Sequence, residues 1–203
     1  MLNIAMSPDQ LIGLVKDAEG GGGFYLTSPD EDAVKAGQPR AWWEQVEIAS
    51  VEIEHDPKGD NFPESERHKV SVTFRVVDEA TWLGHDMAPL GASDNAGRSQ
   101  TDRFYLTPPS EKDNLNTMTD ISTGKLGQAA FAGMNLSADN PEGIPTNSEG
   151  KVDPLELIQQ ATGTFVWARF RRYRDDYTKA GESTPTEAYR TEFSQAMPIE
   201  VEG

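Results

Sequence analysis

The alternation of apolar and polar residues predicts a chain built mainly from β-strands. Residues 69–77 show it most clearly, because valine or phenylalanine occupies every second position and polar residues lie between them. Residues 98–107 and 164–174 alternate in a similar way, and residues 188–201 are expected to add one or two strands. Antiparallel strands with one buried face produce this pattern.

The segment 43–54 combines two alternation patterns that do not share a phase. Val46 and Ile48 would lie on one face of a regular strand, whereas Val51 and Ile53 would lie on the other. The change of parity between these two pairs predicts a β-bulge, which adds one residue and bends the strand. We therefore expect one long strand that serves two sheets or turns the corner of a barrel.

Helices are expected in three places. Ser7 and Gln10 form a capping box that predicts a helix over residues 11–18. An apolar stripe predicts a second helix over residues 124–134, and a third is expected to start near residue 154, after an aspartate that can cap it. The order along the chain is then three strands, a helical region and two further strands.

Composition and charge limit the classes of protein to consider. The chain has 203 residues, which favours one domain, and a formal net charge of −16 at pH 7. This negative charge argues against general attraction to DNA or to an anionic membrane, so any nucleic-acid contact needs a local basic patch. The absence of cysteine excludes disulfides and thiol catalysis. No apolar run approaches the ~20 residues of a membrane span and no signal peptide is recognised, so we expect a cytoplasmic protein without a membrane partner.

No group of residues predicts catalysis or metal binding. His55, His68 and His85 lack the spacing of a zinc site, and the acidic clusters lack the spacing of a calcium-binding EF-hand loop. The glutamates within residues 47–54 fit exposed strand positions better than a catalytic pair. The sequence therefore predicts no enzyme, no catalytic residue, no metal site and no cofactor.

One segment departs from the acidic character of the chain. Residues 163–174 contain four arginines and no acidic residue. On a strand, Val166, Ala168 and Phe170 would share the core face. The opposite face would then hold Phe165, Trp167, Arg169, Arg171 and Tyr173. Such a mixture suits single-stranded nucleic acid, because bases stack on aromatic rings while cations contact the phosphates.

Other positions expected to be exposed extend this candidate nucleic-acid-binding surface. Lys69 and Arg75 lie on the polar face of one strand, and Arg103 and Tyr105 lie on the exposed face of another. The neighbouring loops hold further aromatic and cationic residues that could clamp a strand. The predicted nucleic-acid-binding residues are Phe62, Lys69, Arg75, Arg103, Tyr105, Phe165, Trp167, Arg169, Arg171, Tyr173, Tyr177 and Lys179.

A purely structural explanation of the arginine-rich strand stays open. On so acidic a protein the arginines can pair with the chain's own carboxylates, and Asp175 and Asp176 follow directly. Trp167 would belong to the core if helices covered both faces of its strand. For Phe62 and Tyr177, ordinary loop packing competes with base stacking.

The order of elements and the chemistry of these faces resemble the OB-fold single-stranded-DNA-binding proteins, in particular the divergent ones of bacteriophages. The resemblance implies a mainly β fold with minor α content: a five-stranded antiparallel barrel with a helical insertion between strands three and four. It places an N-terminal lead-in at residues 1–41 and the barrel domain at residues 42–203, with the insertion at about residues 108–163. It also implies coating of single-stranded DNA without sequence specificity, in replication or recombination within a host cytoplasm.

Partners and rival functions remain open. The sequence does not separate DNA from RNA, and it allows a homo-oligomer or contact with replication and recombination proteins. A different class of function is a virion structural or assembly protein, in which the sheet serves assembly. A third is an acidic DNA mimic that occupies the DNA site of another protein. A basic, aromatic groove on an otherwise negative surface would favour the first function.

Overall fold

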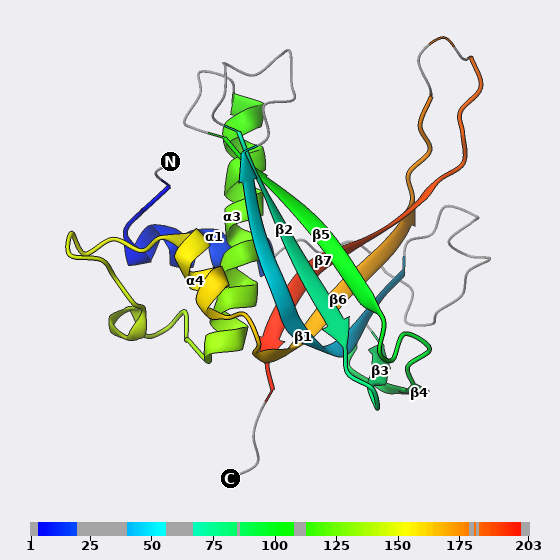
Figure 1. Cartoon of the computed structure of the whole chain (residues 1–203), viewed down its shortest axis with the longest axis horizontal. Coiled ribbons are helices and arrows are strands. Elements are labelled where there is room, and N and C mark those ends of the chain that lie inside the picture. Colours follow the sequence, from blue (N-terminus) through cyan, green and yellow to red (C-terminus); the bar gives the residue numbers. More distant parts are fainter. Residues whose placement is uncertain are drawn as a thin grey trace.

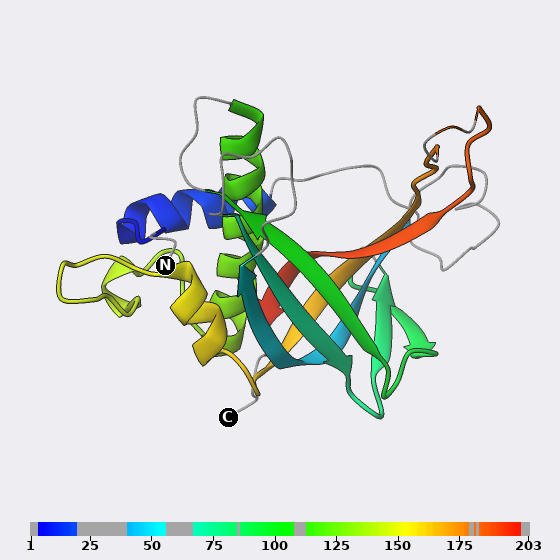
Figure 2. The same cartoon turned by 45° about the horizontal axis from the view of Figure 1, so that its top comes forward.

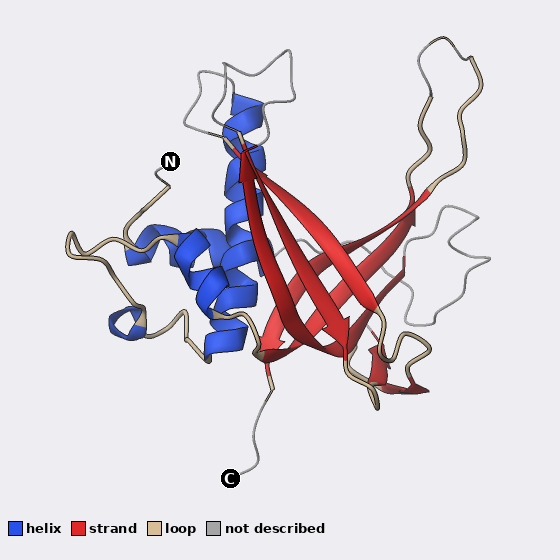
Figure 3. Ribbon diagram, in the orientation of Figure 1, coloured by secondary structure: helices blue, strands red, loops and turns tan. Residues whose placement is uncertain are grey.

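The computed structural model describes residues 4–19, 40–55, 67–84, 86–107, 113–178, 181 and 183–199. This part of the chain is mainly β, with seven strands joined in one antiparallel sheet. The helices lie together on one side of the molecule and most of the sheet lies on the other (Figure 1, Figure 3). Among the described residues, no helix is both long enough and apolar enough to cross a membrane.

The predicted order of strands and helices is present, with two additions. The strands are β1 (Arg40–His55), β2 (His68–Val76), β3 (Thr81–Gly84), β4 (Pro89–Ala92), β5 (Ser99–Leu106), β6 (Phe165–Arg174) and β7 (Tyr189–Pro198). The helices are α1 (Pro8–Glu19), α3 (Asp113–Met134) and α4 (Pro154–Gln160), with a 3-10 turn η1 (Pro141–Gly143).

The additions are the hairpin β3–β4 and the first half of α3. Each hairpin strand has four residues, which is too short for alternation to be recognised, so the sheet has seven strands where the sequence predicted five. Helix α3 begins eleven residues before the predicted start at residue 124. Its early turns are rich in asparagine and threonine, which are weak helix formers and hide the helical pattern.

Strand β1 forms the centre of the sheet, because it pairs with β2 and β3 on one side and with β6 on the other. The predicted bulge is confirmed: Ile48 lies opposite Phe74 whereas Ser50 lies opposite Thr73, which leaves Ala49 as the extra residue. The extra residue shifts the alternation of β1 by one position. As a result, the pair Val46 and Ile48 and the pair Val51 and Ile53 face the same core. Beyond these partners, β2 pairs with β5, β6 with β7, and β3 with β4.

The sheet curls until β5 and β7 approach each other, but no backbone ladder closes it among the described residues. Two side chains of β5 bridge the gap instead. The Gln100 amide donates to the Thr191 carbonyl oxygen at 3.1 Å, and the Asp102 carboxylate accepts a hydrogen bond from the Phe193 backbone N–H. Gln100 thus lies opposite Thr191, and Asp102 lies opposite Phe193. Because the residue numbers rise together on the two strands, β5 and β7 run in the same direction where they meet, which we call the β5–β7 seam.

The core lies between the curved sheet and α3. Phe74, Phe170 and Phe193 are almost completely buried, and the rings of Phe74 and Phe193 stack with their centroids 4.8 Å apart. Leu126 and Phe131 of α3 belong to the same buried cluster. Burying each such side chain stabilises the fold by about 1.5–3 kcal/mol, so this cluster holds the curled sheet against the helix.

Helix α1 packs on α3 and joins the same core. Leu11 and Val15 are buried against α3. Two glycines of α3 permit the close approach: a Cβ at Gly124 would lie 2.4 Å from the Leu14 carbonyl oxygen, and one at Gly127 would lie 2.7 Å from a Val15 methyl group. The helix within the expected N-terminal lead-in is therefore part of the same packed unit as the sheet.

Candidate nucleic-acid interface

The strand register brings most of the predicted binding residues onto one face of the sheet, which we call the outer face. Its register-matched residues include Arg103 and Tyr105 on β5, Lys69 and Arg75 on β2, Gln45 and Glu47 on β1, Phe165, Trp167, Arg169, Arg171 and Tyr173 on β6, and Gln195 and Met197 on β7. The opposite face of the same strands carries the buried valines and phenylalanines. Alternation in the sequence predicted this separation of faces.

An aromatic pair on β6 is the most exposed apolar feature of the outer face. The Phe165 side chain is 52% exposed and Trp167 is partly exposed, whereas Val166 and Ala168 between and beside them are fully buried. Two residues along a strand span about 7 Å, so the two residues follow each other along β6, between β1 and β7. Within the described part of the chain, neither ring contacts another aromatic ring. Phe165 is thus largely open to solvent and Trp167 is open in part.

The cation nearest to this pair across the sheet is Arg75. Glu47 of β1 lies directly between the two, opposite Phe165 on one side and opposite Arg75 on the other. Arg75 donates to the Glu47 carboxylate through Nε at 3.0 Å and through a terminal nitrogen at 2.5 Å. The positive charge that the sequence predicted at Arg75 is thus balanced by a carboxylate.

The remaining predicted residues of β2 and β5 are Lys69, Arg103 and Tyr105, and their surroundings differ. Lys69 forms an ion pair with Glu54 at 2.5 Å. The Tyr105 ring is covered by the guanidinium of Arg67, whose central carbon lies 4.0 Å from the ring centroid. Arg103 is exposed and forms no ion pair with any described residue. Of these positions, Arg103 presents the least neutralised charge.

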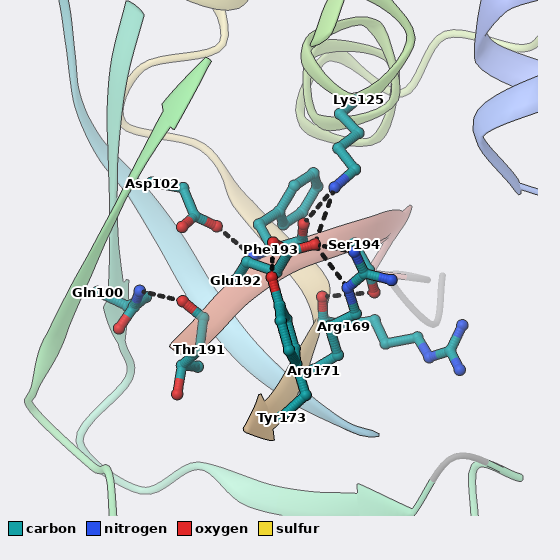
Figure 4. A network of polar contacts seen from close by, with 10 residues as sticks. All are labelled: Gln100, Asp102, Lys125, Arg169, Arg171, Tyr173, Thr191, Glu192, Phe193 and Ser194. Atoms are coloured by element: carbon teal, nitrogen blue, oxygen red, sulfur yellow. Dashed lines mark hydrogen bonds and ion pairs between the residues drawn. The ribbon is translucent and has the colours of Figure 1, made fainter. Parts of the chain in front are cut away.

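The far half of β6 is occupied by a polar network centred on Glu192 of β7 (Figure 4). The Arg171 guanidinium and the Tyr173 hydroxyl both donate to the Glu192 carboxylate. Lys125 of α3 lies 3.4 Å from the same carboxylate and also donates to the Phe193 carbonyl oxygen at 3.2 Å. This part of β6 matches the structural explanation that the sequence left open, because its cations pair with the chain's own carboxylate.

Electrostatics within this network follow from burial and charge. Burial alone would raise the pKa of Glu192, but the positive charges of Lys125 and Arg171 and the hydrogen bonds from Arg171 and Tyr173 outweigh it and lower that pKa. Burial raises the pKa of Tyr173, and the nearby Glu192 carboxylate raises it further. The tyrosine therefore stays a hydrogen-bond donor at neutral pH and holds Glu192 in its ionised form.

Arg169 is less accessible than the alternation of β6 predicted. Its side chain is only 5% exposed, and it donates to the Gln195 side chain at 2.9 Å. Its register is regular on the β1 side, opposite Trp43, whereas on the β7 side a register shift between Arg169 and Phe170 leaves Ser194 as an extra residue. No signal in the sequence marks this shift, because neither glycine nor proline occurs there.

The loop positions predicted to clamp a strand are only partly described. Tyr177 is half exposed and its backbone pairs with Thr186 across the β6–β7 loop. Arg174 at the base of this loop pairs with Asp176 at 2.8 Å. Phe62 and Lys179 lie outside the described residues.

Sequence reasoning missed Glu192, described above, and also Asp102 on β5, a second carboxyl group with a perturbed pKa. Burial raises the pKa of Asp102 from 3.8 to about 6, helped by the negative charge of Glu192 and opposed by the hydrogen bond from the Phe193 N–H. The group lies beside a cavity of about 340 Å³ along the β5–β7 seam, which also includes Arg103, Lys125 and Arg190. The sequence could not reveal this environment, because an aspartate within one strand gives no indication of which strand will lie beside it.

The described residues hold no group of three or more histidine, aspartate or glutamate side chains that could bind a metal ion. Comparison with known proteins gives no match: no family model, no curated protein and no solved structure is similar to this chain. The function therefore has to be argued from the geometry of the chain itself.

Proposed function

We propose that the protein is a non-enzymatic single-stranded-DNA-binding protein that binds its ligand across the outer face, without reading the base sequence. The observation that carries the proposal is the pair Phe165 and Trp167, exposed and partly exposed, on the half of β6 whose other face is buried at Val166 and Ala168. Each aromatic ring can stack one base for about 1–3 kcal/mol. Arg75 and Arg103 lie on the same face and can contact phosphates.

The arrangement of strands supports this proposal, because it is the one expected for an OB-fold. Strands β1, β2 and β5 form a three-stranded meander, and α3 follows the meander before the chain enters β6. Strand β6 then returns to pair with β1, and β7 lies beside β5 in the same direction. In OB-folds the outer face of the second and third strands binds oligonucleotides, and on this proposal β2 and β5 would take the place of those two strands. The resemblance to phage proteins extends the proposal to replication or recombination.

The charge balance of the outer face predicts the mode of binding. Since Lys69 and Arg75 are paired with glutamates, a phosphate has to replace a carboxylate at each position. Such an exchange yields little net electrostatic free energy, so stacking has to supply most of the affinity. We therefore expect a weak salt dependence compared with proteins that present an unpaired basic groove.

The test is fluorescence anisotropy with a labelled oligo-dT and with the same oligonucleotide annealed to its complement. Single strands should bind at least about tenfold more tightly, because duplex bases are not free to stack on the outer face. The measurement is repeated at about 50 mM and about 200 mM salt, where a shallow decrease in affinity is expected. Equal affinity for single strand and duplex, or no binding to either, would reject the proposal and favour a role in assembly.

A further inference from the structure

The β5–β7 seam joins the two ends of the curled sheet, and no backbone ladder spans it among the described residues. Figure 2 shows that β5 and β7 cross and then diverge toward α3, so the two strands meet over a short length only. A cavity of about 340 Å³ lies along the seam and is lined by residues of β5, β7 and α3. The closure of the sheet therefore depends on the side chains that reach across the seam.

Side chains of β5 and α3 take the place of a neighbouring strand along β7. The Asp102 carboxylate of β5 accepts a hydrogen bond from the Phe193 N–H, and Lys125 of α3 donates to the Phe193 carbonyl oxygen at 3.2 Å (Figure 4). Two residues earlier on both strands, the Gln100 amide donates to the Thr191 carbonyl oxygen at 3.1 Å. In a regular sheet these groups of β7 would bond to the backbone of the adjacent strand. Since two of the three side chains are ionisable, the closure of the seam depends on their charge.

The charged groups that face Asp102 come from three elements. Those that line the seam cavity with it are Arg103 on β5, Lys125 on α3, and Arg190 and Glu192 on β7. On β2 the residue opposite Asp102 is Val72, which carries no charge. Glu192 opposes the ionisation of Asp102 and Lys125 favours it, but Lys125 also lies 3.4 Å from the Glu192 carboxylate. The ionised Asp102 therefore shares its nearest cation with a second acid.

The two carboxyl groups at the seam respond differently to pH. Burial, helped by the negative charge of Glu192, raises the pKa of Asp102 to about 6. Burial also opposes the ionisation of Glu192, but the charges of Lys125 and Arg171 outweigh it and lower the pKa of Glu192. Between mildly acidic and neutral pH, Asp102 thus changes its charge while Glu192 stays ionised.

We propose that the β5–β7 seam is a proton-controlled joint, which is closed while the Asp102 carboxyl holds a proton and opens locally when that carboxyl is ionised. Opening breaks the contacts of Asp102 and Gln100 with β7 and admits water to the carboxylate, which recovers the hydration that burial removes. Each strand keeps its other neighbour, since β5 remains paired with β2 and β7 with β6. Such local openings cost less free energy than global unfolding, and amide hydrogen exchange measures them.

Native-state hydrogen exchange of the full chain, followed by NMR at single amides, tests the joint. The Phe193 N–H reports on the seam, and the Ile48 N–H, which donates to the Thr164 carbonyl oxygen at 2.9 Å, reports on the centre of the sheet. After correction for intrinsic exchange, the opening constant at Phe193 should rise by about tenfold to a hundredfold between about pH 4 and about pH 7, because the pKa of Asp102 returns toward 3.8 in the open seam. At neutral pH, Phe193 should exchange faster than Ile48 and should respond little to dilute urea, since a local opening exposes little surface.

Two variants assign the effect to the seam, and a third is the matched control. Asp102→Asn cannot ionise, so the corrected opening constant at Phe193 should no longer depend on pH. Lys125→Gln removes the cation that favours the ionised carboxylate, so it should increase opening at neutral pH by about threefold or more. Asp139→Asn makes the same substitution at an exposed residue that pairs with Lys16, and it should leave exchange at Phe193 unchanged.

Exchange at Phe193 as slow as at Ile48, with the same urea dependence, would show that the seam opens only when the whole protein unfolds, and the inference would be wrong. A pH dependence at Phe193 that survives in Asp102→Asn would also reject it, because another group would then control the opening. Neither result bears on oligonucleotide binding, since Phe165 and Trp167 do not line the seam cavity. The proposed function is tested separately.

Discussion

Glu47 on β1 holds Arg75 on the adjacent strand β2 through two hydrogen bonds, at 2.5 and 3.0 Å. The pair lies in one register row with Phe165, which faces Glu47 from the other side of β1. The acidic residue therefore separates the exposed aromatic ring from the nearest guanidinium. This position makes Glu47 the residue whose removal most directly changes the charge of the outer face.

We predict that Glu47→Gln increases the affinity for single-stranded oligo-dT by about threefold to tenfold and makes it more dependent on salt. The reason is that Arg75 becomes available to a phosphate without first losing a carboxylate partner. Fluorescence anisotropy at two salt concentrations measures both effects. The stability of the protein should change by less than about 1 kcal/mol, because the guanidinium of this pair is largely exposed.

Glu52→Gln is the matched control for this change. It removes the same charge from the same strand, but Glu52 is exposed and forms no ion pair with a described residue. Its effect on affinity should be smaller than that of Glu47→Gln. Equal gains for the two variants would mean that net charge alone, and not the release of Arg75, controls binding.

Replacement of Trp167 tests the stacking surface. We predict that Trp167→Ala weakens binding to oligo-dT by about 5- to 150-fold, which corresponds to the loss of one stacked base at about 1–3 kcal/mol. Leu90→Ala provides the control, because Leu90 is 41% exposed on β4, a strand that contributes no residue to the outer face. That variant should bind as the unmodified protein does. A Trp167→Ala protein that stays folded and binds normally would show that the ring takes no part in binding.

The raised pKa of Asp102 predicts an unusual dependence of stability on pH. A carboxyl group whose pKa is raised to about 6 on folding holds its proton more tightly in the folded state, so its ionisation destabilises the fold. The stability that the protonated Asp102 carboxyl allows is fully present below pH 3.8 and is lost as the pH rises to about 6. From the shift between these two values, the loss amounts to about 3 kcal/mol.

Asp102→Asn isolates this effect, because the amide oxygen can still accept the hydrogen bond from the Phe193 N–H. We predict that the variant is more stable than the unmodified protein at pH 7.5 and that the difference disappears near pH 4. Urea unfolding at a series of pH values measures it. Asp102→Ala removes the acceptor and leaves the Phe193 N–H without a partner, so it should be less stable than Asp102→Asn at every pH. Identical pH profiles for the asparagine variant and the unmodified protein would contradict the assignment.

The contact between α1 and α3 gives a stability prediction that does not depend on function. Gly124→Ala places a Cβ 2.4 Å from the Leu14 carbonyl oxygen, so the helices have to separate and stability should fall by about 1–3 kcal/mol. Gly13→Ala is the matched change on α1, where a Cβ meets no atom within 4 Å. That variant should gain about 0.5–1 kcal/mol, since alanine favours the helix over glycine. Thermal unfolding of the two variants should therefore show midpoint shifts of opposite sign.

Several features of the fold could be predicted because they depend on local patterns. The bulge in β1 follows from the parity of Val46, Ile48, Val51 and Ile53, which can all be buried only if one residue is extra. Alternation likewise predicts which side chains of β6, such as Val166 and Ala168, face the core and which, such as Phe165, face away from it. Arg169 marks the limit of this reasoning, since the tertiary structure buries a side chain that alternation within the strand predicted to be exposed.

The sequence by itself determined the mainly β class, the order of the long strands and the residues on each face, because alternation is a property of one strand at a time. Only the tertiary structure decided which strands are neighbours. That choice places Glu47 beside Arg75, brings Asp102 against Phe193 at the seam, and gathers Arg40, Arg98 and Arg172 around one cavity. Each of these contacts joins segments far apart in the chain, and their energies depend on distances and burial that exist only after the sheet has curled.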